Sequence, residues 1–150
     1  MGKNAMANVS DLLELKGVTV WSVSSFTPVR EALKLMADKK IGAVMVIQDG
    51  DIAGIFSERD FARKSISIPG FSMNSPVQTL MSSPVYYVLP NQSIEECMTL
   101  MTEKRVRHLP VLDENVLIGI ISIGDVVKHL MQEKHATIQD LESYILKNVK

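Results

Sequence analysis

Apolar residues recur at the spacing of one helical face in two stretches of the chain. In each stretch four of them stand at positions i, i+3, i+4 and i+7, which is typical of an amphipathic helix. The two sets are Val29, Ala32, Leu33 and Met36, and Ile94, Cys97, Met98 and Met101. A cap residue followed by proline, Thr27-Pro28, predicts the start of the first helix, and the capping-box pattern Ser93–Glu96 predicts the start of the second.

Two short apolar runs joined by turn residues follow each of these helices. Such runs, bounded by Asp, Asn or Gly, favour buried strands connected by a tight turn. The predicted strands are Ala43–Ile47 and Ile52–Phe56, then Leu109–Leu112 and Val116–Ile121. A leading strand is expected before each helix, at Val18–Val23 and Val85–Val88. A closing helix is expected after each strand pair, with apolar positions Phe61 in the first and Val126, Val127, Leu130 and Met131 in the second.

The two halves of the chain are copies of one β-α-β-β-α unit. Sliding the sequence over itself by 65 residues aligns Val20–Asp60 with Val85–Asp125 without a gap, and eleven of the 41 pairs are identical. A unit of about 55–60 residues is marginal alone, so the copies are expected to share a core, with a ligand cleft between them. The expected fold is mixed α/β (α+β), with one repeat at 10–67 and a second at 76–134.

Three further segments complete the expected organisation. Short helices at Ser10–Leu15 and Pro76–Met81 are expected to introduce the two repeats. Ser65–Asn74 contains proline, glycine and serine without a clear period and is expected to be a linker. Residues 135–150 are expected to form a helical tail, because Ile138, Leu141, Tyr144 and Ile145 lie on one face.

Composition and charge exclude several classes of protein. A formal net charge of -1 and a pI near 6.3 provide no basic face for nucleic acid. No apolar run approaches the roughly 18 residues of a membrane-spanning helix, and the first residues lack the apolar stretch of a secretory signal. We therefore expect a cytosolic protein. One cysteine and three scattered histidines show no zinc-ligand spacing, so no metal site is expected.

The motif Gly-x-x-Ser-x-x-Asp stands where a strand should end and the closing helix begin, from Gly54 to Asp60 and again from Gly119 to Asp125. A helix start there would direct free backbone N–H groups and the positive end of the helix dipole towards the serine hydroxyl, which suits a phosphate. The aspartate offers two oxygens to the paired hydroxyls of a ribose. The same spacing is also a helix-capping pattern that needs no ligand. Duplication preserves caps as well as sites, so both interpretations stay open.

Taken together, these segments resemble a tandem pair of cystathionine-beta-synthase domains (CBS domains), from about Ser10 to Lys134. The resemblance is carried by Val20–Val23, Ile41–Val44, Gly54–Asp60, Arg107–Val111 and Gly119–Asp125. It implies two repeats packed with pseudo-twofold symmetry and an adenosine ligand such as AMP, ATP, NAD(H) or S-adenosylmethionine. It also implies that Asp60 and Asp125 hold riboses, that Ser57 and Ser122 face phosphates, and that Val20 belongs to the ligand site.

The two copies differ at positions that bear on the ligand. Arg59 aligns with Gly124, so the first motif is expected to prefer ligands with more phosphate charge. Pro110 aligns with Met45. Because proline has no N–H and sits where a strand ladder is interrupted, we expect adenine to dock differently in the two copies.

Two basic residues are present in the second copy alone. Arg107 and His108 align with Gly42 and Ala43. In the family that the sequence resembles, basic side chains at these positions reach a phosphate. The alternative is a surface arginine and a packed histidine.

These features predict a non-catalytic sensor that binds an adenosine ligand and regulates an unknown partner protein. A homodimer is expected, because Leu130, Met131, Leu141 and Ile145 lie on helix faces with little else to cover them. Two alternatives remain: a structural dimerisation scaffold with vestigial pockets, and a nucleotide-processing enzyme. Against the enzyme stand the lack of a positioned base–nucleophile pair and of metal ligands. Cys97 is expected to be a packing residue rather than a reactive thiol.

Overall fold

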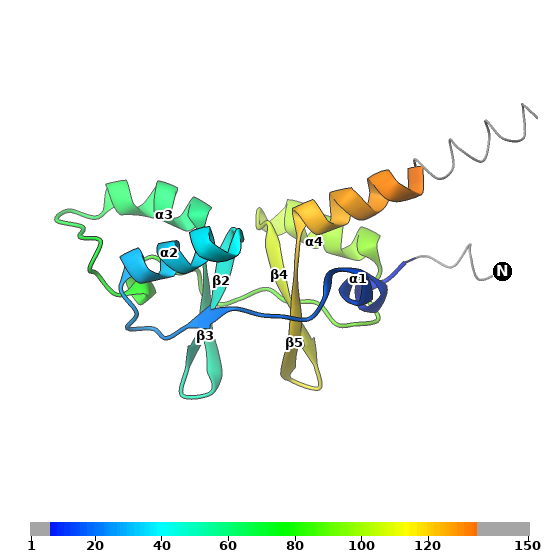
Figure 1. Ribbon diagram of the computed structural model, residues 1–150, viewed down its shortest axis with the longest axis horizontal. Helices are drawn as coiled ribbons and strands as arrows, with labels where there is room; N and C mark the ends of the chain where they lie inside the picture. The colour runs from blue at the N-terminus through cyan, green and yellow to red at the C-terminus, as the bar shows by residue number, and fades with distance from the viewer. Residues whose placement is uncertain (1–6, 135–150) are drawn as a thin grey trace, which may run out of the picture. The chain divides into compact units, whose positions relative to one another are not determined.

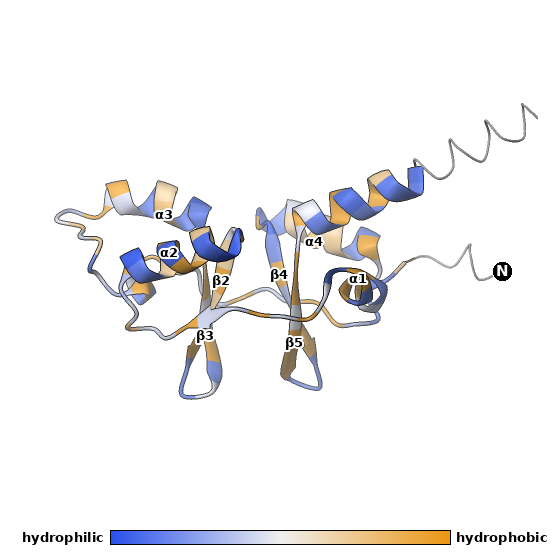
Figure 2. Ribbon diagram, viewed as in Figure 1, coloured by the Kyte–Doolittle hydropathy of each residue, from blue (hydrophilic) through white to orange (hydrophobic). Residues whose placement is uncertain are grey.

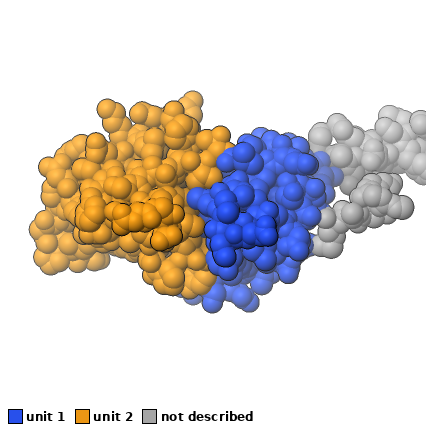
Figure 3. Space-filling view, turned by 90° about the horizontal axis from the view of Figure 1, so that it is seen from below, with its two compact units in different colours: residues 1–18, 87–150 blue, residues 19–86 orange. Residues whose placement is uncertain are grey.

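The computed structural model describes residues 7–134, which fold as two units (Figures 1 and 3). One unit runs from Thr19 to Tyr86, and we call it the central unit. The other combines the described residues 7–18 and 87–134, and we call it the terminal unit. Each unit has its own cluster of buried apolar residues. The predicted tail at 135–150, with Leu141 and Ile145, lies outside the described residues.

The central unit is a three-stranded sheet with helices. β1 runs parallel to β2, β2 runs antiparallel to β3, and the strand order is β1-β2-β3. Positive φ at Asp49 and Gly50 makes the tight turn between β2 and β3. The elements are β1 (Ser22–Val23), α2 (Val29–Lys39), β2 (Ala43–Gln48), β3 (Asp51–Ser57), α3 (Glu58–Lys64), η2 (Ser65–Ser67) and η3 (Val77–Thr79).

The terminal unit repeats the hairpin but loses the leading strand. β4 and β5 form a two-stranded antiparallel sheet, and Val88 makes only an isolated bridge to Val111. In the central unit, Met45 N–H donates to the Trp21 carbonyl at 3.1 Å, a bond that Pro110 cannot make because it has no N–H. The strand predicted at Val85–Val88 is therefore reduced to one bridge. The elements are α1 (Val9–Lys16), α4 (Ile94–Lys104), β4 (His108–Asp113), β5 (Val116–Ser122) and a helix over the described residues 123–134.

The helix starts follow the capping signals in one repeat but not in the other. Ser93 caps α4 in the predicted capping box with Glu96. The first residue of α2 is Val29, its N-cap is Pro28, and no side chain caps it, so the prediction that Thr27 caps this helix is wrong. The Thr27 hydroxyl instead accepts a hydrogen bond from Ser24 N–H. The N–H groups of Val29 and Arg30 donate to carbonyls of the segment at 73–75, which therefore satisfies the first N–H groups of the helix.

The introductory segments are exchanged between the repeats. α1 opens the first repeat in the sequence but packs in the terminal unit, where Val9, Leu12 and Leu13 join the core. η3 opens the second repeat but packs in the central unit, where Val77 and Leu80 are fully buried. Sequence repeat and packing unit are therefore different divisions of this chain.

The glycine of each Gly-x-x-Ser-x-x-Asp motif makes room for the exchanged segment. A Cβ at Gly54 would lie 2.7 Å from Met81 Sδ and 2.8 Å from the Ser82 carbonyl oxygen. A Cβ at Gly119 would lie 2.7 Å from a Leu13 methyl group. Both contacts are shorter than van der Waals distance, so close packing explains why glycine stands in both copies.

The predicted linker Ser65–Asn74 is also part of the core. Ile68, Phe71 and Met73 are half-buried against the cluster of the central unit, and the Phe71 ring meets the Phe61 ring edge-on at a centroid distance of 6.2 Å. Figure 2 shows hydrophobic residues along the strands and polar residues at the hairpin turns. The apolar residues of the segment at 65–74 follow no regular period, and a proline and a glycine interrupt them, so no sequence pattern indicates that they pack in the core.

Candidate functional site

Both motifs form a capping box at a junction of strand and helix. β3 ends at Ser57, where the Ser57 N–H donates to Asp60 Oδ2 at 2.9 Å and Asp60 N–H donates back to Ser57 Oγ at 3.1 Å. β5 ends at Ser122, and the same two bonds to Asp125 measure 2.8 and 3.1 Å. Each aspartate is thus the third residue of its helix, whose side chain satisfies the N–H of the cap residue. Both motifs therefore cap their helices, and a ribose at either aspartate stays a prediction.

The remaining amide groups at these helix starts are largely used as well. Glu58 N–H donates to the Gly42 carbonyl at 3.0 Å, and Ile123 N–H donates to the Arg107 carbonyl at 2.9 Å. Three N–H groups at each junction therefore have an acceptor within the protein. At these three positions of each junction no N–H group is left for a phosphate, because the cap and a carbonyl just before the neighbouring strand already accept from them.

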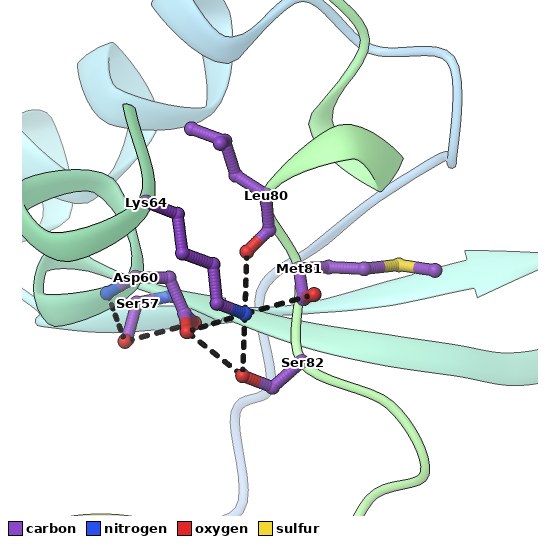
Figure 4. A network of polar contacts seen from close by, with 6 residues as sticks. All are labelled: Ser57, Asp60, Lys64, Leu80, Met81 and Ser82. Atoms are coloured by element: carbon purple, nitrogen blue, oxygen red, sulfur yellow. Dashed lines mark hydrogen bonds and ion pairs between the residues drawn. The ribbon is translucent and has the colours of Figure 1, made fainter. Parts of the chain in front are cut away.

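Asp60 lies in a closed network (Figure 4). Its Oδ2 accepts from Ser57 N–H and from the Ser57 hydroxyl at 3.0 Å. Its Oδ1 accepts from the Ser82 hydroxyl at 2.8 Å and lies 3.2 Å from Lys64 Nζ. Lys64 Nζ also donates to the Leu80 and Met81 carbonyls. The Asp60 side chain is 12% exposed, so these contacts are shielded from water.

Asp125 has fewer partners and is more exposed. Its Oδ2 accepts from Ser122 N–H and from Lys16 Nζ at 2.7 Å, and Lys16 also donates to the Ile120 carbonyl. Among the described residues 7–134, every donor to this carboxylate reaches Oδ2. The side chain is 24% exposed, twice the figure for Asp60. Asp125 Oδ1 is therefore available to a ligand donor in a way that the Asp60 oxygens are not.

The terminal unit brings four of the predicted site residues together. His108 pairs with Ser122 across the β4–β5 hairpin, and the Arg107 carbonyl accepts the first helical N–H, so both basic residues lie beside the Asp125 motif. Arg107 is exposed and His108 is half-buried. At the matching place in the central unit, Ala43 pairs with Ser57 and contributes no polar side chain. The cationic groups at the two motifs are therefore unequal.

The remaining four predicted site residues lie at separate positions in the two units. Val20 is half-buried just before β1, and Arg59 is half-buried on α3. Pro110 is buried in β4 opposite Ile120. Gly124 is exposed in the first turn of the helix over 123–134. Their part in ligand binding stays a prediction.

Three residues that contact the aspartates were not predicted. Lys64 stands four residues after Asp60 on a short helix, a spacing that favours an ion pair, so the sequence held a usable signal for it. Lys16 is 109 residues from Asp125, and Ser82 is 22 residues from Asp60. Nothing in a linear pattern indicates either contact, because both depend on the exchange of the introductory segments.

Cys97 has the environment of a packing residue. It is fully buried in the core of the terminal unit. Burial, with a smaller contribution from the negative charge of Glu96, raises the pKa of the Cys97 thiol from 9.0 to about 11. Since the thiolate is the nucleophile, this thiol is unreactive near neutral pH. Within residues 7–134, no group of His, Cys, Asp and Glu side chains is arranged to hold a metal ion.

Comparison with known proteins identifies the family. The family model for the CBS domain matches residues 9–67 and again residues 77–132. This chain belongs to the CBS domain family. The match occurs twice, so the chain is a tandem CBS protein with the mixed α/β fold that the sequence predicted.

Related CBS proteins span most of the chain. The mitochondrial CBS domain-containing protein CBSX3 of Arabidopsis thaliana is 34% identical over 147 residues, covering 91% of this chain and 71% of that protein. The structure of a protein with CBS domains from Burkholderia ambifaria is 47% identical, with a TM-score of 0.80 over 84% of this chain and 95% of that chain. Another CBS domain pair, 17% identical, shares the fold with a TM-score of 0.72 over 85% of this chain and 98% of that chain. Its structure contains 5′-methylthioadenosine and S-adenosyl-L-methionine.

In the part of the chain that the structure describes, no helix combines the length and the apolar character that crossing a bilayer requires.

Proposed function

We propose that this CBS protein is a non-catalytic cytoplasmic sensor, which binds an adenosine ligand such as AMP, ATP, NAD(H) or S-adenosylmethionine and regulates a partner protein. The observation that carries the proposal is the set of side chains around Asp125. A carboxylate with an available oxygen, a serine hydroxyl and three nitrogen-containing side chains, Lys16, Arg107 and His108, come from different elements of one unit. This combination matches a ribose with its attached phosphate better than it matches a purely structural cap.

The chemistry of each group supports a distinct role. Asp125 Oδ1 can accept hydrogen bonds from the 2′ and 3′ hydroxyls of a ribose, and charge-assisted bonds of this kind are stronger than neutral ones. Arg107 is exposed and permanently charged, and its planar guanidinium suits a phosphate. The capping box of the second motif fixes Ser122 and Asp125 before any ligand arrives, which lowers the entropy cost of binding. The nucleoside-containing CBS structure of the same fold supports an adenosine ligand.

We also propose that the protein is a homodimer. On the helix over 123–134, Val126 is buried, whereas Val127, Leu130 and Met131 are 46%, 37% and 65% exposed. The matching residues of the first copy, Ala62, Ser65 and Ile66, form a less apolar surface on α3 and η2. An apolar helix face of this kind suits an interface between two copies. Sedimentation as a dimer at micromolar concentration is expected, and a clean monomer would contradict this part of the proposal.

Thermal unfolding in the presence of ligands tests the binding function. At about 100 times its dissociation constant, a ligand stabilises the folded protein by about 2.7 kcal/mol, which raises Tm by roughly 5–10 °C for a chain of this size. AMP, ATP, NADH and S-adenosylmethionine are the ligands to compare, with ribose 5-phosphate as a control that lacks the base. We expect a rise in Tm with at least one adenosine compound that exceeds the rise with the control.

The absence of any such rise would favour the second candidate, a structural scaffold with vestigial pockets. The specific observation that favours a scaffold is that both motifs are complete capping boxes without a ligand. A scaffold also predicts that neither aspartate affects the binding of any nucleoside.

A further inference from the structure

We propose that Lys64 and Ser82 close the first motif and thereby direct ribose binding to Asp125. The inference rests on the proposed function, because it concerns which of the two motifs takes the nucleoside. In this proposal Lys64 and Ser82 determine which aspartate binds the ribose, whereas the family resemblance implied one ribose at each aspartate.

Most of the acceptor capacity of Asp60 is already used by the protein. An ionised carboxylate offers about four acceptor positions. Three hydrogen-bond donors reach Asp60, the N–H and hydroxyl of Ser57 on Oδ2 and the hydroxyl of Ser82 on Oδ1, and the Lys64 ammonium forms an ion pair with Oδ1 at 3.2 Å. Figure 4 shows all of them converging on this one side chain. A ribose diol donates two hydrogen bonds, so it could bind Asp60 only by displacing at least one of these groups.

The donors on Oδ1 are held in place by the backbone behind them. Ser82 N–H donates to the Ile55 carbonyl at 2.8 Å, and Ile55 N–H donates to the Ser82 carbonyl at 3.0 Å, which fixes Ser82 against β3. Leu80 is fully buried two residues earlier. Lys64 Nζ donates to the Leu80 and Met81 carbonyls at 3.1 and 3.2 Å as well as to Ser82 Oγ at 3.1 Å. Moving either side chain away from Asp60 would therefore break several bonds at once.

The equivalent positions of the terminal unit leave Asp125 Oδ1 accessible. Leu13 packs on Gly119 as Met81 packs on Gly54, so the residue that corresponds to Ser82 is Glu14. Glu14 is exposed, and an ionised carboxylate has no proton to donate to Asp125. The residue that aligns with Lys64 is His129, whose Nε2 lies 3.4 Å from Glu133 Oε2 on its own helix. The one cation that reaches Asp125, Lys16, lies on Oδ2.

Two substitutions open the first motif in the proposed way. Lys64→Met removes the ammonium but keeps an apolar stem, and Ser82→Ala removes the hydroxyl but keeps the backbone bonds to Ile55. Both are made in the Asp125→Asn background, so that the second motif does not contribute. Adenosine is the probe, since it carries no phosphate and its binding does not depend directly on the charge of Lys64.

Isothermal titration with adenosine measures the affinity of each variant. Asp125→Asn is expected to weaken adenosine binding at least tenfold relative to the unchanged protein. Adding Lys64→Met and Ser82→Ala is expected to raise the affinity for adenosine at least tenfold above that of Asp125→Asn alone. A further Asp60→Asn substitution is expected to abolish this regained binding. Circular dichroism shows whether each variant is folded. If the triple variant unfolds, Ser82→Ala alone in the Asp125→Asn background is expected to raise affinity about threefold, which is half a kcal/mol or slightly more by RT ln 3.

Two results would overturn the inference while leaving the proposed function intact. The first is adenosine binding that survives unchanged in Asp125→Asn, because the ribose would then be held elsewhere. The second is a folded opened variant that binds adenosine no better than Asp125→Asn alone. If the unchanged protein itself binds neither adenosine nor AMP, ATP, NADH or S-adenosylmethionine, the proposed function fails, and the inference fails with it.

Discussion

Leu12→Ala is expected to lower the free energy of unfolding by about 2–5 kcal/mol, although Leu12 lies outside the second repeat in the sequence. Leu12 is 3% exposed and packs in the core of the terminal unit with residues of α4, β4 and β5. Alanine would leave a cavity among side chains that cannot collapse freely, because α1 is held at both ends. Asn8 caps its start, and Lys16 binds the Ile120 carbonyl and Asp125 at its end. Urea unfolding followed by circular dichroism measures the change.

Leu15→Ala is the matched control on the same helix. Leu15 is 71% exposed, so removing the same atoms there is expected to change stability by no more than about 0.5 kcal/mol. Equal effects of the two substitutions would contradict the exchange of the introductory segments, since α1 would then make no contribution to the core of the terminal unit.

Asp125→Asn is expected to reduce nucleoside affinity by tenfold or more while leaving Tm of the ligand-free protein nearly unchanged. An asparagine carbonyl in the position of Oδ2 can still accept from Ser122 N–H and Lys16, so the cap survives. The amide nitrogen then replaces Oδ1 and cannot accept from a ribose hydroxyl. Losing charge-assisted bonds worth about 1.5–3 kcal/mol corresponds to a factor of ten to a hundred in affinity.

Two controls separate this effect from a general change of charge. Asp113→Asn removes the same charge at an exposed position at the end of β4 and is expected to leave affinity unchanged. With 2′,3′-dideoxyadenosine, which lacks the diol, the unchanged protein and Asp125→Asn are expected to bind equally weakly. A full tenfold loss that persists with the dideoxy compound would show that Asp125 does not recognise the ribose hydroxyls.

The hairpins and the helices next to them could be predicted from the sequence because their signals are local. Short apolar runs with Asp49-Gly50 between them predicted β2 and β3, and the structure extends the predicted strands by only one residue at some ends. Ser93 with Glu96 predicted the start of α4 correctly. The proline at 110 gave the reason for a weakened strand ladder, which the structure shows as a single bridge at Val88.

The parts that could not be predicted depend on contacts between distant segments. The sequence predicts a short helix at Ser10–Leu15 but not the unit in which it packs. The start of α2 depends on carbonyls at 73 and 75 rather than on Thr27. The motif residues Ser57, Asp60, Ser122 and Asp125 were found from spacing alone. Spacing does not predict that the two aspartates have different hydrogen-bond partners, because Lys16 and Ser82 reach them only in the folded chain.

Isothermal titration of the unchanged protein tests the central claim, that this CBS protein binds an adenosine ligand at Asp125. AMP, ATP, NADH and S-adenosylmethionine are titrated in turn. We expect saturable heat with at least one of them, and the same ligand is expected to lose at least tenfold of its affinity in Asp125→Asn. Absence of saturable heat with all four ligands, or undiminished binding in Asp125→Asn, would contradict the claim.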